Sequence, residues 1–179
     1  MELAGFAFDV VPANVDERRL NREAPCDYVL RLAFAKAASV ANELSDPRSR
    51  LVIGADTIVV VDGEILQKPA DPDDARRMLH RLSGRSHDVL TGVALVYGAE
   101  RRDAVEQTRV TLVVLDEETV EWYVATGEPS DKAGAYGVQG LAARFVSRID
   151  GSYTNVVGLP VELVDRLLRD IFSQGVQPI

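Results

Sequence analysis

The most apolar stretch of the chain covers positions 51–61, and a single carboxylate, Asp56, lies inside it. β-Branched residues dominate this stretch, which predicts a strand buried on both faces, as in the middle of an α/β sheet. Gly54 and Ala55 come directly before the carboxylate and leave space beside it. Burying a carboxylate is costly unless it has a partner, a metal or a wet cleft. Asp56 is therefore the first candidate for chemistry, and a buried aspartate that pairs with an arginine or caps a loop is the alternative interpretation.

Alternating or continuous apolar residues predict further strands. The expected strands cover residues 6–11, 64–66, 88–97, 106–114 and 145–149. Asp62-Gly63 separates the central strand from residues 64–66 and predicts a two-residue hairpin turn. Gly92 suggests a bulge or the close approach of another backbone.

Helical periodicity is clearest over residues 27–44, where the buried stripe consists of Val29, Leu32, Ala33, Ala37 and Val40. Lys36 falls on this stripe, so its ammonium either reaches water at the edge or points into a cleft. Asp71 is the expected N-cap of a second helix, which Gly84 ends. Helices are also expected over 117–125 and 161–172, and the tail from Ser173 is expected to be frayed. Residues 2–5 have the pattern of a helix end.

Three loops carry polar residues that either serve chemistry or are simply solvated. Residues 128–140 contain three glycines, which favour close approach to a ligand but also occur in plain turns. Asp131, Lys132 and Gln139 lie in this loop. Lys68 is held at a strand end because Pro69 restricts the backbone before it. Glu17 belongs to a charged segment, residues 14–19, for which a solvated connection is the simpler interpretation.

Composition narrows the classes of function. The chain has 179 residues, of which 46% are hydrophobic, and this favours one globular domain, residues 1–179, over disorder. The net charge of −8 argues against broad binding to nucleic acid or anionic membranes. No apolar run is long enough to cross a bilayer, and no secretion signal is visible at the start. The single cysteine, Cys26, excludes an intramolecular disulfide, and a cytoplasmic location is expected.

Several separated stretches, in this order and spacing, resemble the Maf family of nucleoside triphosphate pyrophosphatases. The resemblance runs from about Phe6 to Leu168. The matching stretches are Gly54-Ala55-Asp56-Thr57, Lys68-Pro69, Leu82-Ser83-Gly84-Arg85-Ser86-His87, Thr91-Gly92-Val93, Gly127-Glu128-Pro129, residues 131–140, and Asn155-Val156-Val157-Gly158-Leu159-Pro160.

The resemblance implies an α/β fold of the inosine-triphosphatase type, with a twisted mixed sheet flanked by helices and a central cleft. It implies hydrolysis of a nucleoside triphosphate to the monophosphate and pyrophosphate with a divalent metal, Mg or Mn, in the house-cleaning of nucleotide pools. The Asp-Lys-Ala-Gly-Ala-Tyr form of residues 131–136 is similar to the branch that acts on dTTP and UTP. The family begins with a strand and a Ser-x-Ser-Pro-Arg-Arg loop that helps hold phosphates, and this sequence is expected to start after that point.

The resemblance also assigns residues. The family's catalytic aspartate falls on Asp56, its specificity positions on Thr57 and Gln139, its acid after the first strand on Glu17, and its two lysines on Lys36 and Lys68. The matching loop adds Asp131 and Lys132 to the substrate-binding set.

The chemistry of these residue types agrees with their assignment. Asp56 is suited to take a proton from the attacking water or to bind the metal together with Glu17, and both roles stay open. The lysines would offset phosphate charge, and Gln139 can read the imide edge of uracil or thymine. A nucleotide-binding regulator of cell division with little turnover, or an inactive remnant, are the alternatives. A homodimer is compatible with a chain of this size.

Overall fold

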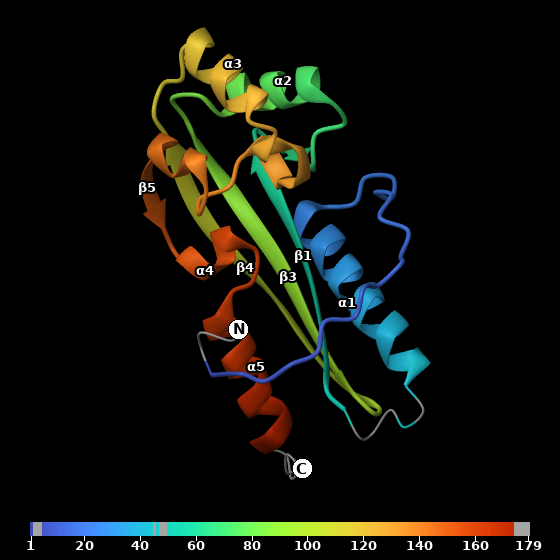
Figure 1. The fold of residues 1–179 in the computed structure, drawn as a ribbon. Helices are drawn as coiled ribbons and strands as arrows, with labels where there is room; N and C mark the ends of the chain where they lie inside the picture. The colour runs from blue at the N-terminus through green and yellow to red at the C-terminus, as the bar shows by residue number, and fades with distance from the viewer. Residues whose placement is uncertain (2–4, 45, 47–49, 174–179) are drawn as a thin grey trace. The chain divides into compact units, whose positions relative to one another are not determined.

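A computed structural model describes residues 1, 5–44, 46 and 50–173. Within these residues, five strands form one sheet in the order β2-β1-β3-β4-β5 (Figure 1). The strands are β1 (Val52–Val61), β2 (Glu64–Leu66), β3 (Ser86–Tyr97), β4 (Glu100–Leu112) and β5 (Val146–Asp150). The helices are α1 (Pro25–Glu43), α2 (Pro72–Leu82), α3 (Glu117–Ala125), α4 (Tyr153–Val157) and α5 (Val161–Ser173). The predicted α/β fold with flanking helices is confirmed.

The sheet differs from the expected mixed sheet because it is antiparallel. β1 pairs with β2 through Val59 and Leu66 and through Val61 and Glu64, as the predicted hairpin requires. Asp62 and Gly63 both have positive φ, 51° and 77°, which is the conformation of a two-residue type I′ turn. Turns as short as this one join only antiparallel neighbours, since a parallel pair needs a long crossover.

α2 begins at its predicted cap, and α1 packs largely as its sequence predicts. The Asp71 carboxylate accepts the N–H of Asp74 at 2.8 Å, and Asp116 does the same for Thr119 at 2.9 Å. Each side chain thereby satisfies one of the backbone donors left free in the first turn of a helix. The predicted stripe of α1 is buried except at Val40, whose place is taken by Ala41.

The contacts of the chain group into two compact units, each with its own core. The first unit comprises residues 1–56, 91–106 and 158–179, and the second comprises 57–90 and 107–157. In the first unit, β3 packs against α5, and the core consists of Val93, Leu95, Leu163, Val164, Leu167 and Ile171. In the second unit, α2 contacts α3 (Figure 1). The large buried residues of its core include Leu66, Leu79, Leu82, Leu112, Tyr123 and Phe145. The single domain and the central cleft stay predictions.

Some local expectations are wrong. Residues 6–11 form no strand in the described chain and are largely exposed, because an apolar segment becomes a strand only where a neighbouring strand offers hydrogen bonds. The expected strand over 88–97 leaves out His87, but β3 begins at Ser86, and His87 is buried within it. Residues 128–140 contain short 3-10 helices, and α4 was not expected. α4 has five residues, too few to show helical periodicity. Residues 2–4 and 174–179 lie outside the described chain.

Two glycines allow α1 to lie directly on the strands of the first unit. A Cβ atom added to Gly54 would stand 2.1 Å from the carbonyl oxygen of Ala33, and one added to Gly92 would stand 2.4 Å from that of Val29. Such distances are impossible for a side chain unless the helix moves. The predicted space beside Asp56 and the predicted close approach at Gly92 are both confirmed, and α1 fills them.

Candidate functional site

A three-residue cluster in the first unit joins two carboxylates through one ammonium group. Lys36 Nζ lies 2.7 Å from Asp56 Oδ1 and 2.8 Å from Glu17 Oε1. Lys36 is on α1, Asp56 is on β1, and Glu17 precedes α1 in the chain. The structure therefore brings together three residues that the sequence placed in the site.

The close packing of α1 on β1 explains this geometry (Figure 1). Side chains two apart on a strand share a face, so Asp56 lies on the face of Gly54, where α1 approaches. Lys36 comes three residues after Ala33 and directly before Ala37, the two residues of α1 that contact Gly54. Its side chain is 23% exposed and that of Asp56 is 11% exposed. The cluster is thus largely buried at Asp56 and opens toward water at Glu17, which is 54% exposed.

Charge stabilises Lys36 in its ionised form. Burial alone would lower the pKa of the Lys36 ammonium, but its hydrogen bonds to Asp56 and Glu17 outweigh burial and raise the pKa. Removal of either carboxylate leaves the other in contact with the ammonium.

Hydrogen bonds to α1 fix the segment that carries Glu17. The hydroxyl of Tyr28, a residue of α1 that is 1% exposed, donates to the carbonyl oxygen of Glu17 at 2.7 Å. The Arg31 guanidinium donates to the carbonyl oxygen of Arg18 at 3.0 Å and pairs with Glu23. The sequence suggested a solvated connection here. The tertiary contacts instead hold this segment against α1 over residues 17–23.

Glu17 and Asp56 suit a hard divalent cation because carboxylate oxygens are its preferred ligands. Both carboxylates converge on one point, which Lys36 Nζ now occupies. No group of three or more His, Cys, Asp or Glu side chains that could hold a metal occurs among the described residues. Two carboxylates are enough for Mg²⁺ when the substrate's phosphates and water complete the coordination. The donor set therefore fits the predicted metal.

A second cluster, in the second unit, contains Lys68, Asp131 and Lys132. Lys132 Nζ donates to Asp131 Oδ1 at 2.5 Å. This hydrogen bond, together with the positive charge of Lys68, lowers the pKa of the Asp131 carboxyl. The N–H of Gly134 donates to the carbonyl oxygen of Gln67 at 3.0 Å, which ties the glycine-rich loop to the segment of Lys68. The structure thus brings together three further residues of the predicted set.

The two predicted specificity residues have different surroundings. Thr57 is half-buried on β1, two residues before Val59, and Val59 packs against Gly134 of the glycine-rich loop. Gln139 is exposed in a turn closed by a 3.1 Å hydrogen bond from Gly140 N–H to the Gly137 carbonyl oxygen. Their assignment to base recognition stays a prediction.

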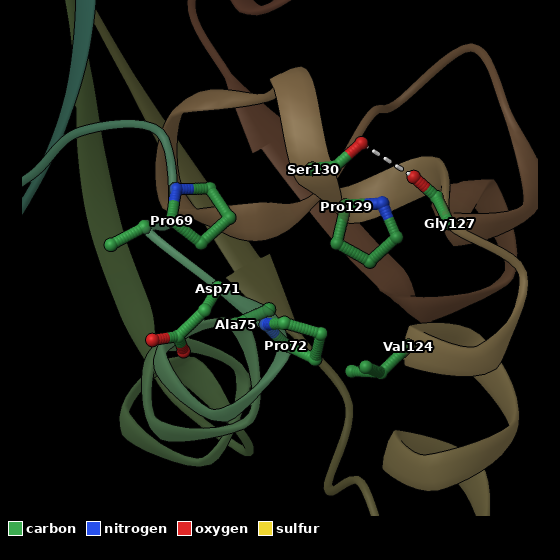
Figure 2. Close-up of a pocket in the computed structure, with 9 residues that line it drawn as sticks. Pro69, Asp71, Pro72, Ala75, Val124, Gly127, Pro129 and Ser130 are labelled. Atoms are coloured by element: carbon green, nitrogen blue, oxygen red, sulfur yellow. Dashed lines mark hydrogen bonds between the residues drawn. The ribbon is translucent and has the colours of Figure 1, made fainter.

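A pocket of about 280 Å³ lies beside the segment of Lys68 in the second unit (Figure 2). Proline rings and aliphatic side chains form most of its wall, and the Asp71 carboxylate within it caps α2. The lining residues are Pro69, Ala70, Asp71, Pro72, Ala75, Val124, Gly127, Pro129 and Ser130. No cation is among them, so this pocket is unsuited to a triphosphate.

His87 is a buried residue that sequence reasoning missed. It is 3% exposed, and its Nε2 lies 2.7 Å from the hydroxyl of Tyr136 in the glycine-rich loop. Extension of the β3 alternation backward from Val89 would have placed it on the buried face. Burial lowers the pKa of His87 to about 4, although the charge of Asp88 acts in the opposite direction.

We expect the buried His87 to make the fold acid-sensitive. The unfolded chain binds a proton near pH 6.5 and the folded chain does not until about pH 4, so stability is full above 6.5 and falls as the pH drops toward 4. Between pH 7 and pH 5 this amounts to about 2 kcal/mol of unfolding free energy. Urea unfolding of His87→Gln should lack this part of the pH dependence. The same change at the exposed His80, the chain's other histidine, should keep it, and equal slopes for both variants would contradict the prediction.

Within the part of the chain that the structure describes, no helix combines the length and the apolar character needed to cross a membrane. A family model described as "Maf-like protein" matches residues 1–171. A protein of Symbiobacterium thermophilum named dTTP/UTP pyrophosphatase is 52% identical over 175 residues, covering 96% of this chain and 89% of the relative. Proteins with the same name from Shewanella denitrificans and Geotalea uraniireducens are 48% and 54% identical, and the matches cover 96% and 93% of this chain and 86% of each relative. Since the family model and these relatives span nearly the whole chain, the chain belongs to the Maf-like family.

Proposed function

We propose that this protein hydrolyses dTTP and UTP to the nucleoside monophosphate and pyrophosphate. The observation that carries the proposal is the convergence of Glu17 and Asp56 on Lys36, in a chain about half identical to proteins named dTTP/UTP pyrophosphatase. This cluster offers two oxygen ligands for a cation and a cation for a phosphate, which a triphosphate needs.

In the proposed reaction, a water oxygen forms a bond to the α-phosphorus while the bond from that phosphorus to the α–β bridging oxygen breaks. Pyrophosphate leaves with the bonding electrons, and the water's proton passes to a carboxylate and then to solvent. Asp56 is the proposed acceptor because its carboxylate is held in place by Lys36 at 2.7 Å. Lys36 and Lys68 offset the charge that builds up on the phosphates.

The proposed cofactor is Mg²⁺ or Mn²⁺, held by Glu17 and Asp56. A bound cation would neutralise phosphate charge and orient the attacking water. Lys36 then has a second role, because its ammonium keeps the two carboxylates 2.7–2.8 Å from a common point before the cation arrives. Asp56 would serve as metal ligand and as acceptor for the water's proton through its two oxygens.

For base recognition, Gln139 is the proposed partner of the imide edge of uracil or thymine, since its amide both donates and accepts. Thr57 offers a hydroxyl to the same task. Asp131 and Lys132 are proposed to contact the substrate from the glycine-rich loop that also carries Gln139.

Pyrophosphate release from UTP, dTTP, CTP and ATP with Mg²⁺ tests the proposal. We expect turnover of UTP and dTTP about fivefold faster than that of CTP, the factor that one net hydrogen bond of about 1 kcal/mol supplies. Equal rates for all four nucleotides would contradict the pyrimidine assignment. Nucleotide binding without release of pyrophosphate would instead favour the regulator of cell division.

We expect Glu17→Gln to weaken Mn²⁺ binding by about tenfold, because the amide lacks the charge that contributes most to a carboxylate–cation contact. Electron paramagnetic resonance measures free Mn²⁺ directly and needs no turnover. Asp16→Asn is the matched control, since this neighbouring carboxylate pairs with Arg18 and not with Lys36. Equal Mn²⁺ affinities for both variants would contradict the role of Glu17.

The proposal includes a cytoplasmic location, supported by the single cysteine and the nucleotide substrate. The homodimer and the absence of nucleic-acid partners stay predictions, for which analytical ultracentrifugation with and without DNA is the measurement.

A further inference from the structure

Glu128 lies at the start of the glycine-rich loop, yet its carboxylate binds the backbone at the loop's other end. Oε2 accepts the N–H of Leu141 at 2.9 Å, and Oε1 accepts that of Ala142 at 3.4 Å. A carboxylate that accepts backbone N–H groups forms charge-assisted hydrogen bonds, which are stronger than neutral ones. Glu128 thus closes residues 128–142 into a loop whose ends are joined.

Tyr123, on α3, connects this carboxylate to a third point of the loop. Its hydroxyl donates to Glu128 Oε1 at 2.9 Å and accepts the N–H of Gly137 at 3.3 Å. Its ring is fully buried and packs edge-on against Phe145 at 5.1 Å between centroids. The hydroxyl is therefore a rigid anchor built on a helix rather than a mobile loop contact.

These contacts lie on both sides of Gln139. Gly137, two residues before Gln139, is held by the Tyr123 hydroxyl, and Leu141, two residues after it, is held by Glu128. A Cβ atom added to Gly140 would stand 2.3 Å from Glu128 Oε1, so the carboxylate lies directly against the backbone next to Gln139. The exposed Gln139 side chain therefore projects from a short segment whose backbone is fixed at two points.

The pKa shifts of Glu128 and Tyr123 agree with an ionised Glu128 carboxylate that holds the loop. Burial would raise the pKa of the Glu128 carboxyl, but the hydrogen bonds from Leu141, Tyr123 and Ala142, together with the charge of Lys132, outweigh burial and lower it. Burial and the hydrogen bond to Glu128 raise the pKa of the Tyr123 hydroxyl, although the N–H of Gly137 acts in the opposite direction, and the hydroxyl therefore stays a donor toward Glu128. Glu128 therefore stays ionised and Tyr123 stays neutral around neutral pH.

We propose that Glu128 and Tyr123 are positioning residues for base selection, which fix the backbone on either side of Gln139 so that its amide meets a pyrimidine imide edge in one orientation. This inference rests on the proposed function for the role of Gln139. Discrimination between bases depends on this fixed orientation, because a mobile amide rotates to satisfy either uracil or cytosine. Neither Glu128 nor Tyr123 contacts the substrate in this proposal.

The test compares Glu128→Gln and Tyr123→Phe with the wild-type protein, and Glu118→Gln serves as the matched control. Glu118 is an exposed carboxylate on α3 that makes none of these contacts. The first readout is hydrogen exchange of the Leu141 and Ala142 amides, which reports the closure of the loop without any nucleotide. The second is the ratio of kcat/KM for UTP over CTP.

We expect both variants to exchange these amides faster and to lower the UTP/CTP ratio by about fivefold, the factor of one net hydrogen bond. Turnover of UTP at saturation should change much less, since the phosphate-binding residues are untouched. Tyr123→Phe keeps the buried ring and removes only the hydroxyl, so it supplies the test if Glu128→Gln does not fold. The control variant should match the wild type in both readouts.

Faster exchange with an unchanged base ratio would overturn the proposal, since closure of the loop would then be purely structural. Unchanged exchange would overturn it as well. If the wild-type protein releases no pyrophosphate, the proposed function fails by itself, and the ratio of the dissociation constants for UMP and CMP then supplies the second readout. Retention of that ratio in both variants would overturn the positioning role.

Discussion

Asp56→Asn is expected to lower kcat for pyrophosphate release from UTP by about three orders of magnitude, within the range that a positioned general base contributes. The asparagine keeps the shape of the side chain and one oxygen acceptor. It loses the charge that attracts a cation and the capacity to take a proton from water. Both losses act on the step in which the water attacks, so kcat should fall much more than KM rises.

The same substitution should leave the fold intact, because Lys36 keeps Glu17 as a partner at 2.8 Å. Thermal unfolding and the near-ultraviolet circular dichroism spectrum check this. Asp62→Asn is the matched control, since Asp62 is an exposed carboxylate in the β1–β2 turn that pairs with Arg85. A normal kcat for Asp56→Asn, or an equal loss in both variants, would contradict the catalytic assignment.

Gly92→Val and Gly54→Val should be the most destabilising single substitutions in the first unit. Added side chains would meet the backbone of α1 at Val29 and Ala33 within 2.1–2.4 Å, and backbone cannot rotate away as a side chain can. We expect a loss of about 3 kcal/mol or more in the free energy of unfolding for each variant, at the upper end of the cost of overpacking. Urea unfolding measures this loss.

Gly127→Asn controls for the removal of a glycine. Gly127 has a φ of 76°, which asparagine tolerates better than other side chains, and no atom lies within 4 Å of an added Cβ. Its unfolding free energy should change by less than about 1 kcal/mol, since left-handed asparagine costs little in turns. Gly54→Val should also lower activity, because displacement of α1 moves Lys36 away from Asp56. If Gly54→Val and Gly92→Val were as stable as Gly127→Asn, α1 would be free to shift, which would contradict the prediction.

Much of the fold could be predicted because its signals are local. The carboxylates of Asp71 and Asp116 cap helices within three residues of themselves, and Asp62-Gly63 sets its own hairpin. The strand at 6–11 was wrong for the opposite reason: its apolar residues carry no information on whether a neighbouring strand is present. α4 was missed because its five residues are too few to show helical periodicity. At its start the Asn155 N–H donates to the Ser152 hydroxyl at 3.2 Å.

The residues of the candidate site likewise fall into two groups, those that the sequence indicated and those that it did not. Asp56 stood out as a lone carboxylate among apolar residues, and the family resemblance supplied the other site residues. Nothing in the sequence indicated that Glu128 closes the loop of Gln139, because a glutamate before a proline looks the same whether it is solvated or bound to backbone. His87 lies outside the strand predicted over 88–97, although the alternation of β3 continues through it.

The sequence by itself determined most of the segments that become helices and strands, since capping, turn and periodicity signals act within a few residues; α4 and the lack of a strand at 6–11 are the exceptions. It also determined the family, since the motifs keep their order along the chain. Only the tertiary structure decided that Lys36 bridges Glu17 and Asp56, that His87 meets Tyr136 and that Glu128 binds Leu141. Lys36 and Asp56 are 20 residues apart in the sequence, His87 and Tyr136 are 49 apart, and Glu128 and Leu141 are 13 apart. Such contacts form because packing brings distant segments together. The contact between Lys36 and Asp56 also depends on Gly54, which leaves room for α1.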